Sequence, residues 1–258
     1  MRLLCIGDVV GKAGCEFLRK KLPVIKRHYA IDAVIINGEN SAEGNGITPF
    51  SAEHIFTSGA DVITTGNHVF RQKSVHELLD YNSFLIRPAN YPDSALGKGY
   101  CLVDFGHTRM AVINLLGTVY MEPLDCPFET ADKMLEKAKS DSANIIVIDI
   151  HAEATAEKKA LAFYLDGKVS AVFGTHTHVQ TADAQILENG TGFITDVGMT
   201  GPYISVLGVK PELSVARLKD KAAVKFMNAD GPCILEGCIF DIDQKSGKCT
   251  SAEAIRIM

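Results

Sequence analysis

The chain has 258 residues, a formal net charge of −5 at pH 7 and 47% hydrophobic residues, a composition typical of a globular protein with a full core. The acidic charge argues against a protein that coats long nucleic acid non-specifically. It does not exclude a small anionic substrate that is neutralised by bound metal. No stretch approaches the roughly 20 apolar residues that a membrane-spanning helix needs, and we expect no contact with membranes.

The seven cysteines are scattered, and no two of them form a Cys-x-x-Cys pair. Several lie within apolar runs, as buried free thiols do. The N-terminal apolar run is too short for a signal peptide. We therefore expect a reduced, cytoplasmic protein with neither a disulfide framework nor a zinc finger. No linker, repeat or low-complexity segment divides the chain, so we expect one domain over residues 1–258.

The first part of the chain alternates between strands and helices. Short apolar runs predict strands at residues 3–6, 33–36 and 61–65. The helices expected between and after them are residues 15–28, kinked or split by Pro23, a segment capped by Thr48 and ended by Gly59, and residues 70–80. This order implies parallel strands that are joined by right-handed crossovers. The polar loop that ends at Gly46 is expected to be exposed.

The rest of the chain adds antiparallel strands. Hairpins are expected at 99–105 with 109–115 and at 185–187 with 192–195. The other expected elements are helices at 129–139, at 155–165 capped by Thr155, and at 211–218, strands at 145–150, 169–173, 222–228, 233–241 and 249–257, and a Gly-rich loop at 199–210. The sequence thus predicts an α/β fold in which two mixed sheets pack together and helices flank them. The loops at 41–47 and 199–210 are candidates for covering a substrate.

A buried strand that ends at Gly174 is followed by two histidines, His176 and His178. In an extended chain, alternate side chains point to the same side, so both imidazoles are expected to face one point beyond the strand. Imidazole is a common metal ligand. A lone His-x-His pair is more often solvated or packed, and other strand ends must contribute before a site is indicated.

Four further apolar strands are also followed by polar residues. The set of eight is Asp8, Glu39, Asn40, Asn67, His68, His151, His176 and His178. Ligands bind at the carboxyl ends of strands in open α/β sheets, so we expect these side chains to converge. One tetrahedral ion needs four ligands, and the surplus fits two ions about 3.5–4 Å apart. Glu39, with two carboxylate oxygens, is the candidate bridge, and His68, beside Asn67, is the candidate general acid.

Two ions suit the hydrolysis of a phosphodiester. The substrate is anionic and repels hydroxide, whereas two cations clamp its oxygens, activate a water and stabilise the transition state. Taken singly, Asp8 is better explained as a helix cap or a turn residue, and His68 as a partly buried histidine with a backbone partner. Asp196 either orients a ligand histidine or belongs to a plain turn. The five strand ends together favour the metal site.

The motifs Gly7-Asp8, Gly66-Asn67-His68, His151 and Gly174-Thr175-His176-Thr177-His178 resemble the calcineurin-like metallophosphoesterase superfamily. Two departures stand out. Asp8-Val9-Val10 replaces the usual Asp-x-His, and Glu39 within Asn37-Gly38-Glu39-Asn40 replaces the bridging aspartate. Both departures, together with the segment at 195–201, resemble the bacterial YmdB-like branch over essentially the whole chain.

The resemblance implies an αββα sandwich of the metallophosphoesterase type and a bacterial phosphodiesterase for small phosphodiesters, 2′,3′- or 3′,5′-cyclic nucleotides among them. It also implies a ligand set for each ion. Asp8, Glu39, Asn40 and His178 would hold the first ion, Glu39, Asn67, His151 and His176 would hold the second, and His68 would donate a proton to the leaving group. The resemblance implies iron or manganese as the ions, and the mixed oxygen and nitrogen ligands also permit zinc.

Other functions stay open at this point. One alternative is a regulatory or RNA-binding protein in which the ions mainly hold the fold, with an RNA target and little hydrolysis. A phosphomonoesterase is another. An amidohydrolase-like enzyme is a third, but its His-x-His pair would follow the first strand. A homo-oligomer is compatible with all of them.

Overall fold

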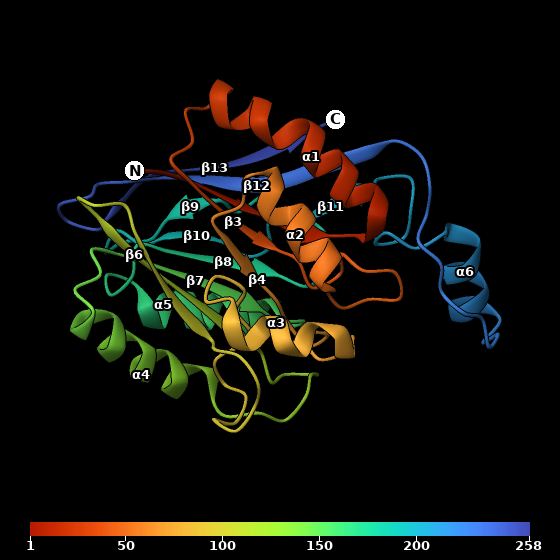
Figure 1. Cartoon of the computed structure of the whole chain (residues 1–258), viewed down its shortest axis with the longest axis horizontal. Coiled ribbons are helices and arrows are strands. Elements are labelled where there is room, and N and C mark those ends of the chain that lie inside the picture. The colour runs from red at the N-terminus through yellow and green to blue at the C-terminus, as the bar shows by residue number, and fades with distance from the viewer.

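The structure is a computed structural model that describes residues 1–258, and it contains two β-sheets with helices on their outer faces (Figure 1). The helices are α1 (Gly11–His28), α2 (Pro49–Ser58), a 3-10 turn (Lys73–Val75), α3 (His76–Tyr81), α4 (Pro127–Ser140), α5 (Thr155–Leu165) and α6 (Pro211–Lys219). Among them, none combines the length and the apolar character that a membrane span requires.

The first sheet has seven strands and the second has six. The first runs β2 (Asp8–Val9), β11 (Met199–Pro202), β12 (Cys233–Ile242), β1 (Arg2–Ile6), β3 (Ala33–Asn37) and β4 (Val62–Thr64), with β13 (Cys249–Ile257) paired to β12. The second runs β5 (Tyr100–Asp104), β6 (Arg109–Leu116), β7 (Ile145–His151), β8 (Ala171–Thr175), β10 (Gly192–Ile194) and β9 (Gln185–Ile186). Each of the two mixed sheets contains a parallel set of strands. This set is β1, β3 and β4 in the first sheet and β6, β7, β8 and β10 in the second.

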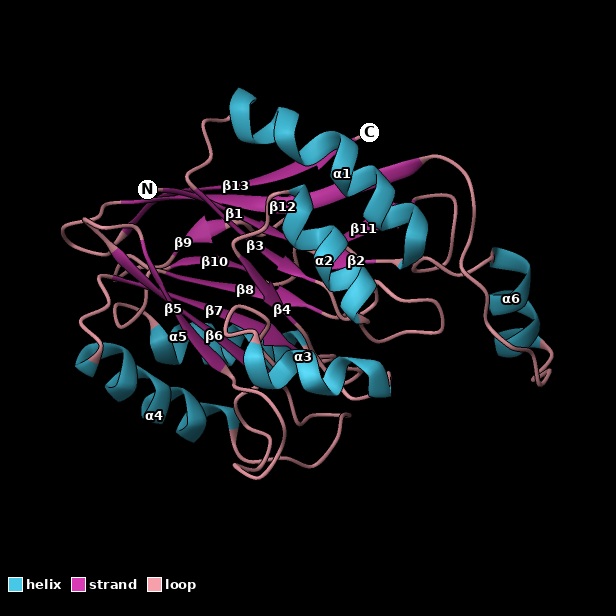
Figure 2. Cartoon of the chain, in the orientation of Figure 1, coloured by secondary structure: helices cyan, strands magenta, loops and turns pink.

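The two-residue period of the strands divides the core into three layers (Figure 2). Leu3 and Cys5 of β1 face the second sheet, whereas Leu4 and Ile6 face α1 and α2. Strand β7 alternates in the same way, and its outward residues pack against α4 and α5. Burial on both faces explains why these strands read as continuous apolar runs. The predicted fold of two packed mixed sheets flanked by helices is confirmed.

Helix α1 runs unbroken from Gly11 to His28, so the predicted split at Pro23 is wrong. Pro23 lies on the exposed face of the helix, where water can satisfy the carbonyl that loses its partner. The opposite face packs Leu18, Leu22 and Ile25 into the core, and this burial holds the helix together across the proline.

Four other elements also differ from the sequence prediction. Residues 199–202 form the buried strand β11 between β2 and β12 instead of a loop. The α-helix expected at 70–80 begins only at His76, and α5 is preceded by Ala154 without a side-chain cap from Thr155. Residues 222–228 form no strand, because the only ladder contact there is an isolated bridge between Val209 and Asn228.

Residues 203–230, here called the arm, extend from the body and carry α6 at their tip (Figure 1). The carboxyl ends of the parallel strands point toward the side of the molecule from which the arm protrudes. Ligand sites of α/β sheets lie at that edge, so the arm stands next to the edge where the predicted site residues are found.

Candidate metal centre

The inter-sheet face of the strands turns from apolar to polar at their carboxyl ends. In β3 the inward series Ala33, Ile35 ends at Asn37, and in β8 the series Ala171, Phe173 ends at Thr175. In β7, Ile145 and Val147 are followed on the same face by Asp149 and His151. All four polar residues are completely buried. A buried polar layer therefore closes the apolar core and underlies the candidate site.

The structure brings all eight predicted residues into one connected cluster, which has two groups of contacts. In the first group, the Asn40 amide nitrogen lies 3.1 Å from Asp8 Oδ1 and 3.1 Å from His178 Nε2. His178 Nε2 lies 3.5 Å from the same Asp8 oxygen. The Asp8 side chain is fully buried and that of His178 is 12% exposed, so the group lies at the floor of the site and still reaches solvent.

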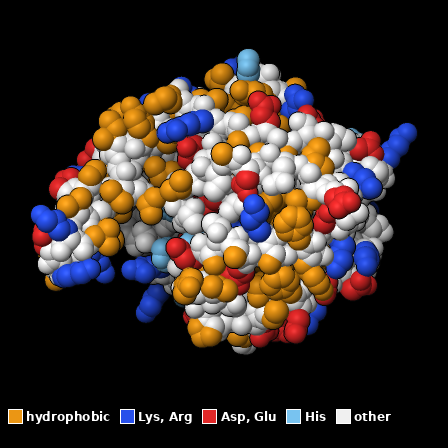
Figure 3. Space-filling model, turned by 180° about the vertical axis from the view of Figure 1, so that it is seen from behind, with side chains coloured by type: hydrophobic (Ala, Val, Ile, Leu, Met, Phe, Trp, Pro, Cys, Tyr) orange, Lys and Arg blue, Asp and Glu red, His pale blue; other side chains and the backbone are white.

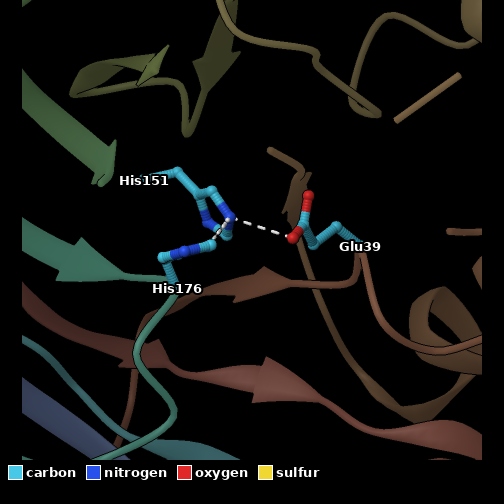
Figure 4. A group of neighbouring side chains, drawn as sticks. All are labelled: Glu39, His151 and His176. Carbon is cyan, nitrogen blue, oxygen red and sulfur yellow. Dashed lines mark hydrogen bonds and ion pairs between the residues drawn. The ribbon is translucent and has the colours of Figure 1, made fainter. Parts of the chain in front are cut away.

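The second group is centred on His151, and Figure 4 shows its imidazole between the side chains of Glu39 and His176. His151 Nε2 lies 2.9 Å from Glu39 Oε1, 3.1 Å from Asn67 Oδ1 and 3.1 Å from His176 Nδ1. The ligand atoms of Glu39, His151 and His176 all lie within 4.8 Å of one another. Ligands at about 2.0–2.2 Å from an ion sit about 3 Å apart, so this spacing suits a coordination sphere.

Glu39 lies between the two groups. Its Oε1 is 2.9 Å from His151 Nε2 in the second group and 3.4 Å from the Asn40 amide nitrogen in the first. Its other oxygen accepts the backbone N–H of His68 at 3.0 Å. Since the carboxylate is buried and contacts both groups, it has the position that a bridging ligand requires.

The outer hydrogen bonds of the three histidines fix which ring nitrogen faces the centre. His178 Nδ1 lies 3.0 Å from the Leu207 carbonyl, which can only accept, so Nε2 presents its lone pair inward. His176 Nε2 lies 3.0 Å from a Glu153 oxygen, which leaves Nδ1 facing His151. Metal-binding histidines are oriented by such outer partners.

His151 is also oriented by an outer hydrogen-bond partner. Its Nδ1 lies 2.9 Å from the Thr175 hydroxyl, which donates its own proton to Asp149 at 2.7 Å. The hydroxyl therefore accepts from Nδ1, and Nε2 is the nitrogen that faces Glu39 and His176. Three inward-facing imidazole nitrogens and the carboxylates of Glu39 and Asp8 thus lie in one cluster. An acceptor-rich cluster of this kind fits a bound cation.

The supporting layer joins the two sheets through the Asp149 carboxylate. It accepts the Thr64 hydroxyl and the Asn37 amide from the first sheet, and the Thr175 hydroxyl from the second. Burial raises the pKa of Asp149 to about 6, although His151 and these donors act against the rise. Sequence reasoning missed Asn37, Asp149, Thr175 and Glu153, although an aspartate inside the apolar run 145–150 was a usable signal.

The backbone conformation of the two histidines after β8 differs from the one expected. Strand β8 ends at Thr175, and His176 and His178 have positive φ angles of 101° and 61°. The prediction of one extended strand with both side chains on the same side is therefore wrong. The turn sends His176 to the group with His151 and His178 to the group with Asp8.

A buried ion pair holds this turn. Lys158 Nζ, which is fully buried, donates to Asp196 at 2.7 Å and to the carbonyl of Thr175 at 2.7 Å. The same Asp196 oxygen accepts the backbone N–H and the hydroxyl of Thr177, between the two histidines. Asp196 contacts neither imidazole, and it positions the histidines through the backbone that carries them.

His68 lies beside the first group, where its Nδ1 is 3.2 Å from Asn40 Oδ1 and 3.5 Å from Glu39 Oε1. Its Nε2 makes no hydrogen bond within the protein, and its side chain is 21% exposed. Burial lowers the pKa of His68 against the attraction of Glu39. The ring thus has one nitrogen anchored at Asn40 and Glu39 and one without a hydrogen bond to the protein.

Comparison with known proteins assigns the chain to a family. A model of the family described as "YmdB-like protein" matches residues 4–255. The chain belongs to the YmdB-like family. The same match confirms the resemblance that the motifs indicated, from Gly7-Asp8 to the Gly174–His178 segment.

Several relatives of this YmdB-like protein share its full length. The 2′,3′-cyclic-nucleotide 2′-phosphodiesterase of Bacillus subtilis (strain 168) is 46% identical over 100% of this chain and 97% of its own. A hypothetical protein from Thermus thermophilus has a TM-score of 0.93 at 38% identity, covering 100% and 99%. A phosphatase from Mycoplasma pneumoniae has a TM-score of 0.93 at 35% identity, covering 100% and 93%.

A more distant structure shares only the fold. The 5′-nucleotidase precursor from Thermus thermophilus is 13% identical with a TM-score of 0.60, and the chain covers 54% of it. The phosphoesterase fold predicted from the motifs is confirmed.

The electrostatics of the YmdB-like site favour positive charge at its centre. Burial lowers the pKa of His151, but the carboxylates of Glu39, Asp8 and Asp149 outweigh it and raise this pKa to about 9. Burial and the neighbouring His151 instead lower the pKa of His176 to about 4. These carboxylates thus favour one positive charge, on His151, and that charge disfavours a proton on His176. A bound cation would supply the same positive charge.

Gly66 shows how tightly the centre is built. A Cβ atom at this position would collide with the His151 ring and with Glu39 Oε2. Only glycine lets the turn that carries Asn67 and His68 approach the second group this closely. The motif glycine is therefore required for the approach of Asn67 to His151.

Proposed function

We propose that this protein is a metal-dependent phosphodiesterase acting on small cyclic nucleotides, with 2′,3′-cyclic nucleotides foremost. The observation that carries the proposal is the convergence of Glu39, His151 and His176, whose ligand atoms lie within 4.8 Å of one another, next to the group of Asp8, Asn40 and His178. The name of the Bacillus subtilis relative supports the choice of substrate. The cytoplasmic location and a homo-oligomeric state stay predictions.

The cluster suggests which residues would hold each ion. Asp8, Glu39, Asn40 and His178 would hold one ion, and Glu39, Asn67, His151 and His176 would hold the other. Both sets mix oxygen with imidazole nitrogen and include no thiolate, which suits iron, manganese or zinc. When bound, such ions supply positive charge for the phosphoryl oxygens and activate a water at neutral pH.

The proposed reaction balances as a simple hydrolysis. The oxygen of a water forms a bond to phosphorus, and the bond from phosphorus to the 2′ oxygen breaks. His68, through its free Nε2, donates a proton to the leaving 2′ oxygen, and the proton lost by water restores the imidazolium. The products are a 2′ hydroxyl and a 3′ phosphomonoester. His68 is anchored for this role by Asn40 and Glu39.

The test is a substrate panel assayed with added manganese. It contains 2′,3′-cyclic AMP, 3′,5′-cyclic AMP, bis(p-nitrophenyl) phosphate and the monoester p-nitrophenyl phosphate. We expect the diesters to be hydrolysed faster than the monoester, with 2′,3′-cyclic AMP giving the 3′ monophosphate. Faster turnover of the monoester would favour a phosphomonoesterase, and no hydrolysis by protein shown to contain metal would overturn the proposal.

A further inference from the structure

The arm differs in charge from the rest of this acidic chain. Residues 203–230 contain five Lys and Arg and three Asp and Glu, whereas the whole chain has a formal charge of −5. The cations gather at the tip, where Arg217, Lys219, Lys221 and Lys225 accompany the single acid Asp220. A local excess of cations on a protein of opposite net charge attracts an anionic partner to that place.

The tip of the arm also contains a cavity lined by cations. Arg217, Lys221 and Lys225 line it, with Ala222, Ala223 and Val224 between them, and its volume is about 610 Å³. No acidic side chain lines this cavity. The three cations that line this open cavity provide positive charge for phosphate groups.

An exposed aromatic side chain lies next to the cavity. The Arg217 guanidinium lies over the Phe226 ring, 4.9 Å from its centroid. Phe226 is 44% exposed, so part of its ring is open to solvent. Aromatic rings and guanidinium planes are the surfaces on which bases of single-stranded nucleic acid stack. The tip of the arm thus combines cations that can bind phosphates with an aromatic ring on which a base can stack.

The arm is joined directly to the candidate metal centre. The carbonyl of Leu207, at the base of the arm, accepts from the Nδ1 of His178. Farther along, Lys210 donates its backbone N–H to Met227 and pairs with Asp230, which ties the two limbs of the arm together. Figure 3 shows a hollow between the arm and the body, with histidine at its inner end and Lys and Arg side chains on the arm.

We propose that the arm binds the chain of a short RNA whose 3′ end, closed as a 2′,3′-cyclic phosphate, occupies the metal centre. This inference rests on the proposed function and extends its substrate class from mononucleotides to RNA ends. A 2′,3′-cyclic phosphate requires a 2′ hydroxyl, which makes the polymer RNA. The preceding phosphates meet Arg217, Lys221 and Lys225, and a base stacks at Phe226.

The experiment compares 2′,3′-cyclic AMP with a pentaribonucleotide that ends in adenosine 2′,3′-cyclic phosphate. The variant is Lys221→Ala/Lys225→Ala, and the control is Lys133→Ala/Lys139→Ala, which removes two exposed lysines from α4. We expect the arm variant to raise the KM of the pentanucleotide about 10-fold and to leave hydrolysis of 2′,3′-cyclic AMP unchanged. The control leaves both substrates unchanged.

Salt dependence gives a second measurement. Each phosphate contact to a single strand contributes about 0.7 to the slope of log affinity against log salt, so losing two lysines reduces this slope by about 1.4. It is measured by fluorescence anisotropy with a pentaribonucleotide that ends in a 3′ phosphate. Phe226→Ala weakens the same binding about 10-fold if a base stacks on the ring. Circular dichroism of each variant checks that the body stays folded.

The outcomes separate the two proposals. Hydrolysis of both substrates with no advantage for the pentanucleotide, and no effect of the arm variant, overturns the RNA inference and leaves the phosphodiesterase intact. No hydrolysis of either substrate by metal-loaded protein overturns the proposed function. A change in sedimentation of the arm variant without any change in RNA binding assigns the arm to contacts between proteins and also overturns the inference.

Discussion

The metal centre and the arm hold their side chains in opposite ways. Around the centre, His151, His176 and His178 each have an outer partner, and the Asp149 carboxylate ties donors from both sheets beneath them. On the arm, Lys221, Lys225 and Phe226 are exposed and have few fixed contacts. Chemistry on a phosphodiester needs fixed geometry, whereas a chain of phosphates can be held by adaptable cations.

This difference predicts that substitutions at the centre act on turnover and metal binding, whereas substitutions on the arm act on the affinity for long substrates. Variants of the centre test the first half of that contrast.

Glu39→Gln has the largest expected effect. The change removes the charge shared by both groups of ligands, so we expect kcat/KM to fall by about 10⁴-fold or more, since each ion contributes several kcal/mol to transition-state stabilisation. Elemental analysis is expected to show less bound metal. Glu43→Gln is the matched control, because Glu43 is exposed in the following loop. Full activity in Glu39→Gln would remove Glu39 from the centre.

His68→Ala is expected to lower kcat by roughly 10²–10⁴-fold, the usual contribution of a general acid, while the metal content stays the same. Stopped assays with 2′,3′-cyclic AMP and elemental analysis of the same sample measure both quantities. His28→Ala, at an exposed position of α1, serves as the control. Unchanged turnover would exclude the role in proton donation, and lost metal would make His68 a ligand.

Lys158→Met leaves the buried Asp196 carboxylate without its cation. Breaking a buried ion pair costs about 3–5 kcal/mol of unfolding free energy, and thermal unfolding is expected at a clearly lower temperature. Lys159→Met is the control, because the pair of Lys159 with Asp183 is half exposed. Equal melting temperatures for the two variants would show that the ion pair does not hold the histidine turn.

Thr175→Val has the smallest expected effect at the centre. It removes the hydroxyl that orients His151, and loss of such an outer partner weakens metal binding about 10–100-fold. Manganese titration of metal-free protein measures this affinity. Thr175→Ser keeps the hydroxyl and is expected to retain wild-type affinity. The same loss in both variants would point to packing instead of the hydrogen bond to His151.

The ligands of the centre could be predicted because they follow buried strands directly. Apolar runs located the ends of β1, β3, β4, β7 and β8, and parallel strands bring their carboxyl ends to one edge. Their roles as metal ligands and the number of ions stay proposals. The turn after β8 was not predictable in this way, because the positive φ angles of His176 and His178 depend on the contacts of Thr177 with Asp196.

The supporting layer and the arm show two other limits of the sequence. Asp149 reads as one polar residue in an apolar strand, and its function in joining the sheets appears only once Thr64 and Thr175 are placed beside it. Residues 222–228 have the composition of a strand, but no neighbouring strand pairs with them on the arm. In both cases the structure depends on contacts with residues distant in the sequence and not on local sequence preference.

We propose that Glu39 lies between two ions held by the strand ends. Anomalous scattering from crystals grown with manganese measures the number and positions of these ions directly. We predict two peaks about 3.5–4 Å apart, one beside Asp8, Asn40 and His178 and the other beside Asn67, His151 and His176. A single peak, or peaks that do not contact Glu39, would contradict the account.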